Sequence, residues 1–416
     1  AHLDLHSFPT RRSSDLPASG AFYRELVRTH GGPLFLLDCD VLRQQYRALR
    51  RALPEVDLYY AVKALPQPDL IEVLHEEGAG FDIASTGEIG LMQQLHIAAR
   101  RTIHTHPIKR DRDIRDALRY GCTTFVVDNP DELLKFLPYR NRVGILLRVS
   151  FRSPSALVDL SKKFGCAVEQ VPEILDLAER AGIHIKGLSF HVGSQCTDTR
   201  QQVRAIETCN LLIRRHHDVA TMPISILDIG GGFPVSYEWR PVDIMAYCAP
   251  IREALAQLPA HVRVIAEPGR YICAPAARTI TTGVGRADRQ GMSWYYLDDG
   301  VYGSFSGQIF DHVRYPLEIF ATEGPVRPSV FAGPTCDSID VVAEDIPLPD
   351  LPLGTLVVGH MMGAYTAATA TEFNSLQKAK VVVRNRHSAF EGAFPPPEHF
   401  ISAVGMTPPE GRRWVH

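Results

Sequence analysis

The stretch VDLYYAVKA, residues 56–64, is an apolar and aromatic run that ends in a single lysine, Lys63. Aromatic and β-branched residues of this kind favour a buried strand. Lysine, in contrast, carries a compact and strongly hydrated charge. A lysine at the end of a buried strand is therefore unusual, and it calls for a structural or functional reason.

Further apolar runs follow at regular intervals, and amphipathic helical patterns lie between most of them. The eight strand candidates are LYYAVKA (58–64), GFDIAS (80–85), TIHTHP (102–107), TFVVD (124–128), GILLRVS (144–150), KGLSFHVGS (186–194), ISILDIGG (224–231) and VRVIAEPG (262–269). Strands that alternate with helices pair in parallel, and eight such units predict an α/β fold with a (β/α)8 barrel of the TIM type. The alternative is a doubly wound open sheet, but no GxGxxG motif follows the first strand.

The pattern of predicted secondary structure changes after the eighth unit. Short β-type runs such as SWYYLDDG (293–300) are separated by Gly, Pro and Asp, without long helical patterns. We therefore expect the barrel to span residues 39–278 and a β-rich domain to span residues 279–416, with residues 21–38 joining the β domain. Residues 1–20 fit neither pattern and are interpreted as a disordered or non-native segment.

Composition excludes several function classes. Hydrophobic residues make up 45% and charged residues 22% of the 416 residues, as in ordinary globular proteins. The net charge of -3, without a dense basic stripe, argues against a nucleic-acid partner. No apolar run reaches the roughly 18 residues of a membrane span. The eight cysteines lack CxxC or CxxH spacing, which predicts reduced thiols, no metal site and a cytoplasmic protein.

Polar and flexible residues gather at the ends of the predicted strands. In a (β/α)8 barrel, the carboxyl ends of the strands form the active-site face. Taken singly, each residue has an ordinary explanation, because a lysine can extend to water, a histidine can be hydrogen-bonded in the core and a glycine run can form a turn. Their convergence on one face predicts a functional site. The residues are Lys63, Asp82, His104 or His106, Arg148, His191, Gly230, Gly231, Gly232 and Glu267.

The residue types at this face suit one cofactor. The glycines of DIGGGFP (228–234) leave backbone N–H groups open to an anion, and barrels often bind phosphate after strands seven and eight. Ser194 adds a hydroxyl and Arg270 a guanidinium. Lys63 can form a Schiff base with an aldehyde, and Glu267 can pair with a basic ring nitrogen. This combination predicts pyridoxal 5'-phosphate.

A set of short motifs runs through the whole chain. They are YAVKA, FDIAS, HVGS, DIGGGFP, EPGRY, YYLDDGVYGSFSGQIFDH, GPTCDSID and GAYTAA. In kind and order they resemble the fold-type III pyridoxal-phosphate decarboxylases over roughly residues 20–405, and the details are most similar to the ornithine decarboxylases. The resemblance implies an alanine-racemase-like architecture, in which a barrel is followed by a C-terminal β domain.

The resemblance also implies roles for the residues of the barrel face. Lys63 corresponds to the lysine that binds the aldehyde, and its pKa is expected to fall in an apolar barrel mouth. His191 corresponds to the imidazole that stacks on the cofactor ring. Glu267 corresponds to the carboxylate that keeps the pyridine nitrogen protonated, so that the ring accepts electrons when carbon dioxide departs. The expected phosphate ligands are Ser194, Gly231, Gly232, Arg270 and Tyr365, and further cofactor-binding candidates are Asp82, Arg148 and Gly269.

A second group of residues is implied outside the barrel. Cys336, in GPTCDSID, resembles the thiol that returns a proton to the substrate carbon, and it is supplied by the β domain of the other subunit. An isolated cysteine is more commonly a buried structural residue, but the motif around Cys336 disfavours that interpretation. The residues expected to complete the partner's site in a homodimer are Cys336, Asp337, Tyr302 and Phe373.

Two carboxylates indicate the substrate. Asp337 and Asp311 resemble acids of the ornithine decarboxylases that meet the distal ammonium of the substrate. The resemblance therefore implies decarboxylation of L-ornithine to putrescine. The alternative for Asp311 is a cap beside Ser304 and Ser306. The functional alternatives are, in order, a dual lysine/ornithine decarboxylase, a diaminopimelate decarboxylase and a non-catalytic regulatory homologue. The first is open because one methylene changes the discrimination between two substrates by only about 1–3 kcal/mol.

Overall fold

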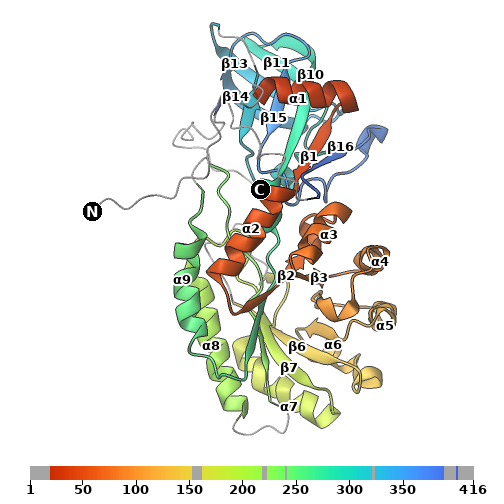
Figure 1. Ribbon diagram of the computed structural model, residues 1–416, viewed down its shortest axis with the longest axis vertical. Helices are drawn as coiled ribbons and strands as arrows, with labels where there is room; N and C mark the ends of the chain where they lie inside the picture. The colour runs from red at the N-terminus through yellow and green to blue at the C-terminus, as the bar shows by residue number, and fades with distance from the viewer. Residues whose placement is uncertain are drawn as a thin grey trace, which may run out of the picture.

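The computed structural model describes residues 19–151, 162–217, 223–238, 241–320, 324–387 and 400–401. A barrel with its helices forms one end of the molecule and a β domain the other (Figure 1). The segment 1–20 lies outside the described residues except for Ser19 and Gly20, which begin helix α1 (Ser19–His30). Within the described ranges, none of the helices has both the length and the hydropathy of a membrane span.

Eight parallel strands close into a barrel, which confirms the predicted fold class. The first strand pairs with the last, so that Leu58 lies opposite Ala266. The barrel interior is apolar, and Ile103, Val126 and Leu146 are buried there. The strands are β2 (Val56–Ala61), β3 (Gly80–Ile83), β4 (Thr102–His104), β5 (Thr124–Val127), β6 (Gly144–Val149), β7 (Ile185–Phe190), β8 (Ile226–Asp228) and β9 (Arg263–Ala266).

Helices cover the outside of the barrel (Figure 1). Local signals in the sequence set their ends: Asp38 caps α2 by accepting a hydrogen bond from the Asp40 amide, and Gly121 ends α5 in the left-handed conformation, with φ 103°. The helices are α2 (Cys39–Ala52), α3 (Pro68–Glu76), α4 (Thr86–Gln94), α5 (Asp111–Tyr120), α6 (Pro130–Leu134), α7 (Val171–Ala181), α8 (Thr199–His217), α9 (Ile244–Leu255) and α10 (Arg270–Cys273).

The β domain is a nine-stranded mixed sheet. Strand β1 (Leu34–Asp38), which precedes the barrel in the chain, pairs with both β10 and β16 of this sheet. The chain therefore enters the sheet, leaves it to build the barrel, and then returns. The other strands are β10 (Ala277–Arg289), β11 (Met292–Leu297), β12 (Leu317–Ile319), β13 (Arg327–Ala332), β14 (Val341–Leu348), β15 (Leu356–Gly359), β16 (Lys380–Arg384) and β17 (Phe400–Ile401), and a short helix, α11 (Gly307–Phe310), follows β11.

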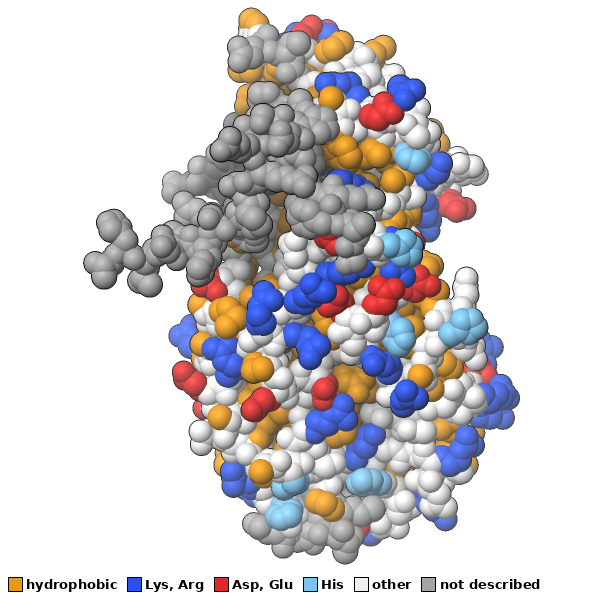
Figure 2. All heavy atoms as spheres, in the orientation of Figure 1, with side chains coloured by type: hydrophobic (Ala, Val, Ile, Leu, Met, Phe, Trp, Pro, Cys, Tyr) orange, Lys and Arg blue, Asp and Glu red, His pale blue; other side chains and the backbone are white. Residues whose placement is uncertain are grey.

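Two segments of the β domain reach the barrel. After β15, the amide of Tyr365 donates to the carbonyl of Ala64 at 3.0 Å, just beyond the carboxyl end of β2. After β16, the Arg386 guanidinium pairs with Glu72 at 2.8 Å and with Glu76 at 3.0 Å, both on α3. Figure 2 shows basic and acidic side chains gathered over α2 and α3, where these helices approach the β domain. These contacts place part of the β domain over the active-site face of the barrel.

Candidate active site

The amine of Lys63 lies at the carboxyl end of the barrel, in the 3-10 turn Val62–Ala64 that follows β2. Its Nζ is 2.5 Å from Oδ2 of Asp82, on the neighbouring strand β3. The side chain of Asp82 is fully buried, whereas 42% of the Lys63 side chain is accessible. The structure thus brings two of the predicted residues together as an accessible amine held by a buried carboxylate.

The expected fall in the pKa of Lys63 is wrong for this arrangement. Burial does act to lower the pKa of the amine, but the negative charges of Asp82 and Glu267 outweigh burial and raise the pKa above its ordinary value. The charges prevail because the nearest carboxylate oxygen, Oδ2 of Asp82, is only 2.5 Å from the amine. As a free amine, Lys63 is therefore protonated at neutral pH and has to lose a proton before it can attack an aldehyde.

Two adjoining acids lie at the carboxyl ends of β8 and β9, and β9 is the strand that pairs with β2. Glu267 comes directly after β9, and Asp228 is the last residue of β8. Burial raises the pKa of Asp228 to about 6. Burial, together with the neighbouring charge of Asp228, raises the pKa of Glu267 well above its ordinary value. A carboxyl group that holds its proton near neutral pH can share that proton with a basic ring nitrogen.

His191, directly after β7, presents a neutral ring to the site. Its Nδ1 accepts a hydrogen bond from the Gly193 amide at 3.0 Å. Burial, followed by the charges of Arg148 and Lys63, lowers the pKa of the imidazole well below its ordinary value. A Cβ placed on Gly231 would lie 3.2 Å from the Nε2 of His191, so the ring faces the glycine loop. A neutral, flat ring in this place suits stacking on an aromatic ligand.

The loop after β8, residues 230–232, adopts a backbone conformation that only glycine accommodates easily. We call it the glycine loop. Gly230 and Gly232 have φ values of 65° and 89°, which side chains rarely adopt. A Cβ on Gly232 would lie 2.2 Å from the carbonyl oxygen of Gly193. The loop can therefore pack against the turn after β7 only without side chains, as the predicted anion-binding role requires.

Arg270, the first residue of α10, gathers several predicted residues around its guanidinium. Its Nε donates to Oγ of Ser194 at 3.2 Å, and the guanidinium carbon lies 4.9 Å from the ring centre of Tyr365. Its Nη2 donates to Oδ2 of Asp311 at 2.5 Å, and its Nη1 donates to the Tyr237 hydroxyl at 2.7 Å. Three expected phosphate ligands thus lie together. Asp311 is paired with one of them, and its contact with a substrate ammonium stays a prediction.

The remaining cofactor-binding candidates lie at the same face. A Cβ on Gly269 would be 3.0 Å from the Cβ of Ala64, so glycine lets this turn approach the turn that carries Lys63. Arg148, on β6, places its guanidinium 5.5 Å from the ring centre of Phe164. We refer below to Lys63, Asp82, His191, Glu267 and Arg270 as the barrel cluster.

Four residues predicted for the partner's site form a second group on connections of the β domain, here called the loop cluster. The rings of Tyr302 and Phe373 are stacked with centres 4.6 Å apart, and the Tyr302 hydroxyl donates to Oδ2 of Asp337 at 2.5 Å. Of the eight cysteines, Cys336 is the exposed one. Among the residues that the structure describes, no hydrogen bond or ion pair joins the loop cluster to the barrel cluster.

Sequence reasoning missed residues that support the barrel cluster. Thr105 donates to Oδ1 of Asp82, and the Tyr237 hydroxyl accepts a hydrogen bond from Arg270. Burial raises the pKa of Glu88 to about 7, beside Asp82. The Ser85-to-Glu88 spacing at the start of α4 is a helix-capping signal that could have drawn attention to Glu88. Thr105 and Tyr237 carry no such signal.

The residues present fit pyridoxal 5'-phosphate. The structure combines an amine, a neutral ring that can stack, an acid that holds a proton, and a side-chain-free loop beside an arginine. An aldehyde, an aromatic ring, a ring nitrogen and a phosphate are the matching groups of that cofactor. Each chemical feature of the cofactor therefore has a suitable residue within one barrel mouth.

Comparison with known proteins agrees with this geometry. Residues 39–274 match the family model "Pyridoxal-dependent decarboxylase, pyridoxal binding domain". The lysine/ornithine decarboxylase of Selenomonas ruminantium is 38% identical, with 84% of this chain and 89% of the relative covered. Antizyme inhibitor 2 of Xenopus laevis is 34% identical, with 82% of this chain and 78% of the relative covered.

A solved structure shows the same architecture. The lysine/ornithine decarboxylase of Vibrio vulnificus, in complex with cadaverine, superposes with a TM-score of 0.84. It is 53% identical, and the match covers 88% of this chain and 98% of that one. From its fold, its barrel site and these relatives, the chain belongs to the pyridoxal-dependent decarboxylase family and is a fold-type III, pyridoxal 5'-phosphate-dependent amino acid decarboxylase.

Proposed function

We propose that the protein decarboxylates L-ornithine to putrescine and also accepts L-lysine. The observation that carries this proposal is the carboxylate of Asp337, next to Cys336 in the loop cluster. The hydrogen bond from Tyr302 holds the pKa of Asp337 below its ordinary value, so this group is an anion at neutral pH. An anion in the substrate end of the site suits a distal ammonium and repels a second carboxylate.

The geometry favours tolerance of chain length. Asp311, the other acid expected at the distal end, is held by Arg270, whereas Asp337 lies on an exposed connection of the β domain. One accessible acid can meet an ammonium on chains of slightly different length. Because one methylene changes binding by only about 1–3 kcal/mol, we expect a preference rather than exclusion between the two substrates. The relatives named lysine/ornithine decarboxylases support this dual assignment.

The residues of the chain have distinct roles in this proposal. When bound, pyridoxal 5'-phosphate supplies an electron-accepting ring for the electrons left by carbon dioxide. Lys63 holds the aldehyde carbon, His191 packs against the ring and Glu267 keeps a proton at the ring nitrogen. The glycine loop and Arg270 hold the phosphate. Cys336 returns a proton to the substrate carbon.

We further propose that the protein acts as a homodimer in which each loop cluster completes the barrel cluster of the partner. Two observations support this proposal: the accessible Cys336, and the lack of any polar contact between the clusters within the described part of one chain. Phe373 is 42% exposed although it is a large apolar residue, as expected of a surface that a second copy covers.

Carbon dioxide release from parallel substrates tests the assignment. We would supply the cofactor-loaded protein with L-ornithine, L-lysine, L-arginine and meso-diaminopimelate. We expect kcat/KM for ornithine and lysine to lie within about 100-fold of each other, and both values to exceed those for the other two. A higher value for diaminopimelate would leave the fold and cofactor intact but contradict the role of Asp337. No release from any of the four would favour a non-catalytic homologue.

A further inference from the structure

The connection between β4 and α5, residues 105–110, lies beside the barrel cluster and contacts it. Its first residue, Thr105, donates its hydroxyl to Oδ1 of Asp82. The Thr105 amide donates to the carbonyl of Ile83 at 3.1 Å, which ties the connection to β3 directly beside Asp82. The two oxygens of Asp82 therefore have separate partners, since Oδ2 binds Lys63.

This arrangement matters because neither partner of the ion pair is fixed by itself. Lys63 has a flexible side chain, and 42% of it is accessible. A carboxyl group rotates easily about its last bond, since that torsion has a broad energy profile. A hydrogen bond to Oδ1 removes this freedom, so that Oδ2 keeps its direction toward the amine. Thr105 is itself only 7% exposed, which protects the bond from competition by water.

A second residue of the connection holds it in place. The side chain of Lys109 is folded back under the backbone, where its Nζ donates to three carbonyl oxygens: those of His106 at 2.7 Å, Pro107 at 2.9 Å and Val126 at 2.5 Å. An ammonium group has three donors, so all of them are used. Lys109 is 2% exposed, and its bond to Val126 joins the connection to β5.

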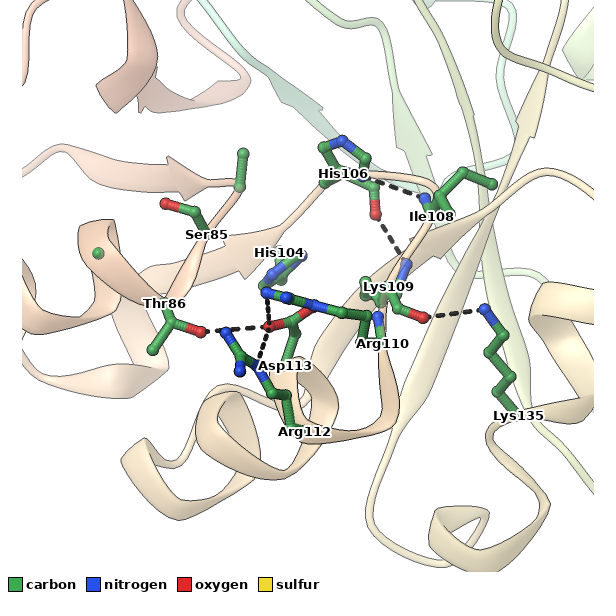
Figure 3. A pocket seen from close by; sticks show the side chains of 12 residues that line it. Ser85, Thr86, His104, His106, Ile108, Lys109, Arg110, Arg112, Asp113 and Lys135 are labelled. Carbon is green, nitrogen blue, oxygen red and sulfur yellow. Dashed lines mark hydrogen bonds and ion pairs between the residues drawn. The ribbon is translucent and has the colours of Figure 1, made fainter.

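The outer side of the connection borders a hollow. A hollow of about 640 Å³ opens there, between the starts of α4 and α5, and it is lined by His106, Ile108 and Lys109 among others. Figure 3 shows Lys109 bonded to His106 on one side, while its own carbonyl accepts from Lys135 on the other. The hydrogen bonds of Lys109 therefore contribute to fixing the backbone at this edge of the site.

We propose that Thr105 is a positioning residue for the decarboxylase, which orients Asp82 and through it the amine of Lys63, and that Lys109 anchors the connection that carries Thr105. The inference rests on the proposed role of Lys63. Neither Thr105 nor Lys109 touches the reacting atoms in this assignment. Their effect is on the direction and the protonation of the lysine.

The test replaces Thr105 by valine, which keeps the shape of the side chain and removes the hydroxyl. The matched control is Thr102→Val at the other end of β4, where a buried hydroxyl donates to the carbonyl of Ala99 at 2.7 Å, away from the site. We expect Thr105→Val to lower kcat for L-ornithine by about tenfold or more, as for a lost hydrogen bond to a charged group, with KM changed less than about twofold. Thr105→Ser should restore kcat.

A second measurement follows Lys63 without turnover. The rate at which stripped protein takes up pyridoxal 5'-phosphate, followed by the absorbance of the bound cofactor, rises with pH as Lys63 loses its proton. A less well oriented Asp82 stabilises the protonated amine less, so at a given pH between about 7 and 9 Thr105→Val should take up the cofactor faster than wild type. Thr102→Val should match wild type. Lys109→Met should change the uptake rate in the same direction as Thr105→Val.

Two results separate this inference from the assignment on which it rests. If Lys63→Ala is inactive while Thr105→Val matches Thr102→Val in kcat and in the uptake profile, the positioning role is overturned and the role of Lys63 stands. If Lys63→Ala retains full turnover, the assignment of Lys63 fails, and the positioning role fails with it.

Discussion

The barrel cluster and the loop cluster differ in how much of their environment one chain supplies. In the barrel cluster, Asp82 and Glu267 are buried, and every charged group meets a partner from another strand or turn. In the loop cluster, Cys336 is exposed and Asp337 has a single tyrosine as its side-chain donor. In the proposed assignment, one chain therefore supplies the cofactor-binding residues, but it presents outward the residues proposed for substrate binding and proton transfer.

This difference has a chemical meaning. Burial and neighbouring charges shift the pKa values of Lys63, His191 and Glu267, so the barrel fixes the protonation of its groups before a ligand arrives. The loop cluster can acquire such an environment only when something covers it. We therefore expect the barrel cluster to bind the cofactor within one chain. We expect the loop cluster to act only when a second copy of the chain covers it.

The largest effect is expected at the barrel amine. Lys63→Ala should reduce decarboxylation by at least about 10³-fold, because Lys63 is the amine proposed to hold the aldehyde. The variant should also lose the absorbance of lysine-bound cofactor. Activity and absorbance measured side by side check this, with Lys378→Ala as a control at an exposed lysine. Undiminished turnover in Lys63→Ala would contradict the account of the barrel cluster.

The next effect is expected at the exposed thiol. Cys336→Ala should lower kcat by about 10²-fold, within the range for the loss of a positioned proton donor, while cofactor binding stays as in wild type. Replacing a buried cysteine, as in Cys209→Ala, should affect stability more than kcat. Steady-state kinetics together with cofactor absorbance separate the two. An unchanged kcat in Cys336→Ala would remove the loop cluster from the chemistry.

A smaller effect concerns stability in acid, which should depend on the barrel region. His104 is 1% exposed, and burial lowers its pKa to about 4 from an ordinary 6.5. Between these pH values the unfolded chain binds the proton and the folded chain does not, so the folded state loses stability as the pH falls. The loss amounts to about 1.4 kcal/mol per pH unit for one fully titrating group.

Urea titrations of wild type and His104→Phe at pH 7 and pH 5 check this prediction. Phenylalanine can pack beside Phe125, whose ring centre lies 5.7 Å from that of His104. The variant should lose less unfolding free energy than wild type between the two pH values. An equal loss would show that His104 does not cause the acid sensitivity.

The smallest effect is expected from the tyrosine of the loop cluster. Tyr302→Phe removes the hydroxyl that donates to Asp337 but keeps the ring stacked on Phe373. Because the bond is only partly buried, we expect KM for ornithine to rise by less than about tenfold, with kcat nearly unchanged. A large fall in kcat would instead place Tyr302 in proton transfer.

The sequence allowed the fold to be predicted, and it allowed the polar residues at the barrel mouth to be expected together, because strand ends and short motifs are local features. Edge strand β14 was missed, since its VVAEDIPL run mixes acids and a proline that only an edge tolerates. The rise in the pKa of Lys63 could not be predicted, because it depends on the distances to Asp82 and Glu267 that barrel closure creates. For the same reason, the pairing of Asp311 with Arg270 was not visible in the sequence.

The most direct test of the central claim mixes two inactive variants. Lys63→Ala keeps an intact loop cluster and Cys336→Ala keeps an intact barrel cluster, so a dimer of one with the other contains one complete site. Random pairing of equal amounts gives about half mixed dimers, hence about a quarter of the wild-type activity. Recovery of that activity after co-refolding or co-expression is the predicted result. If the mixture stays as inactive as its components, the two clusters do not complete one another across a dimer.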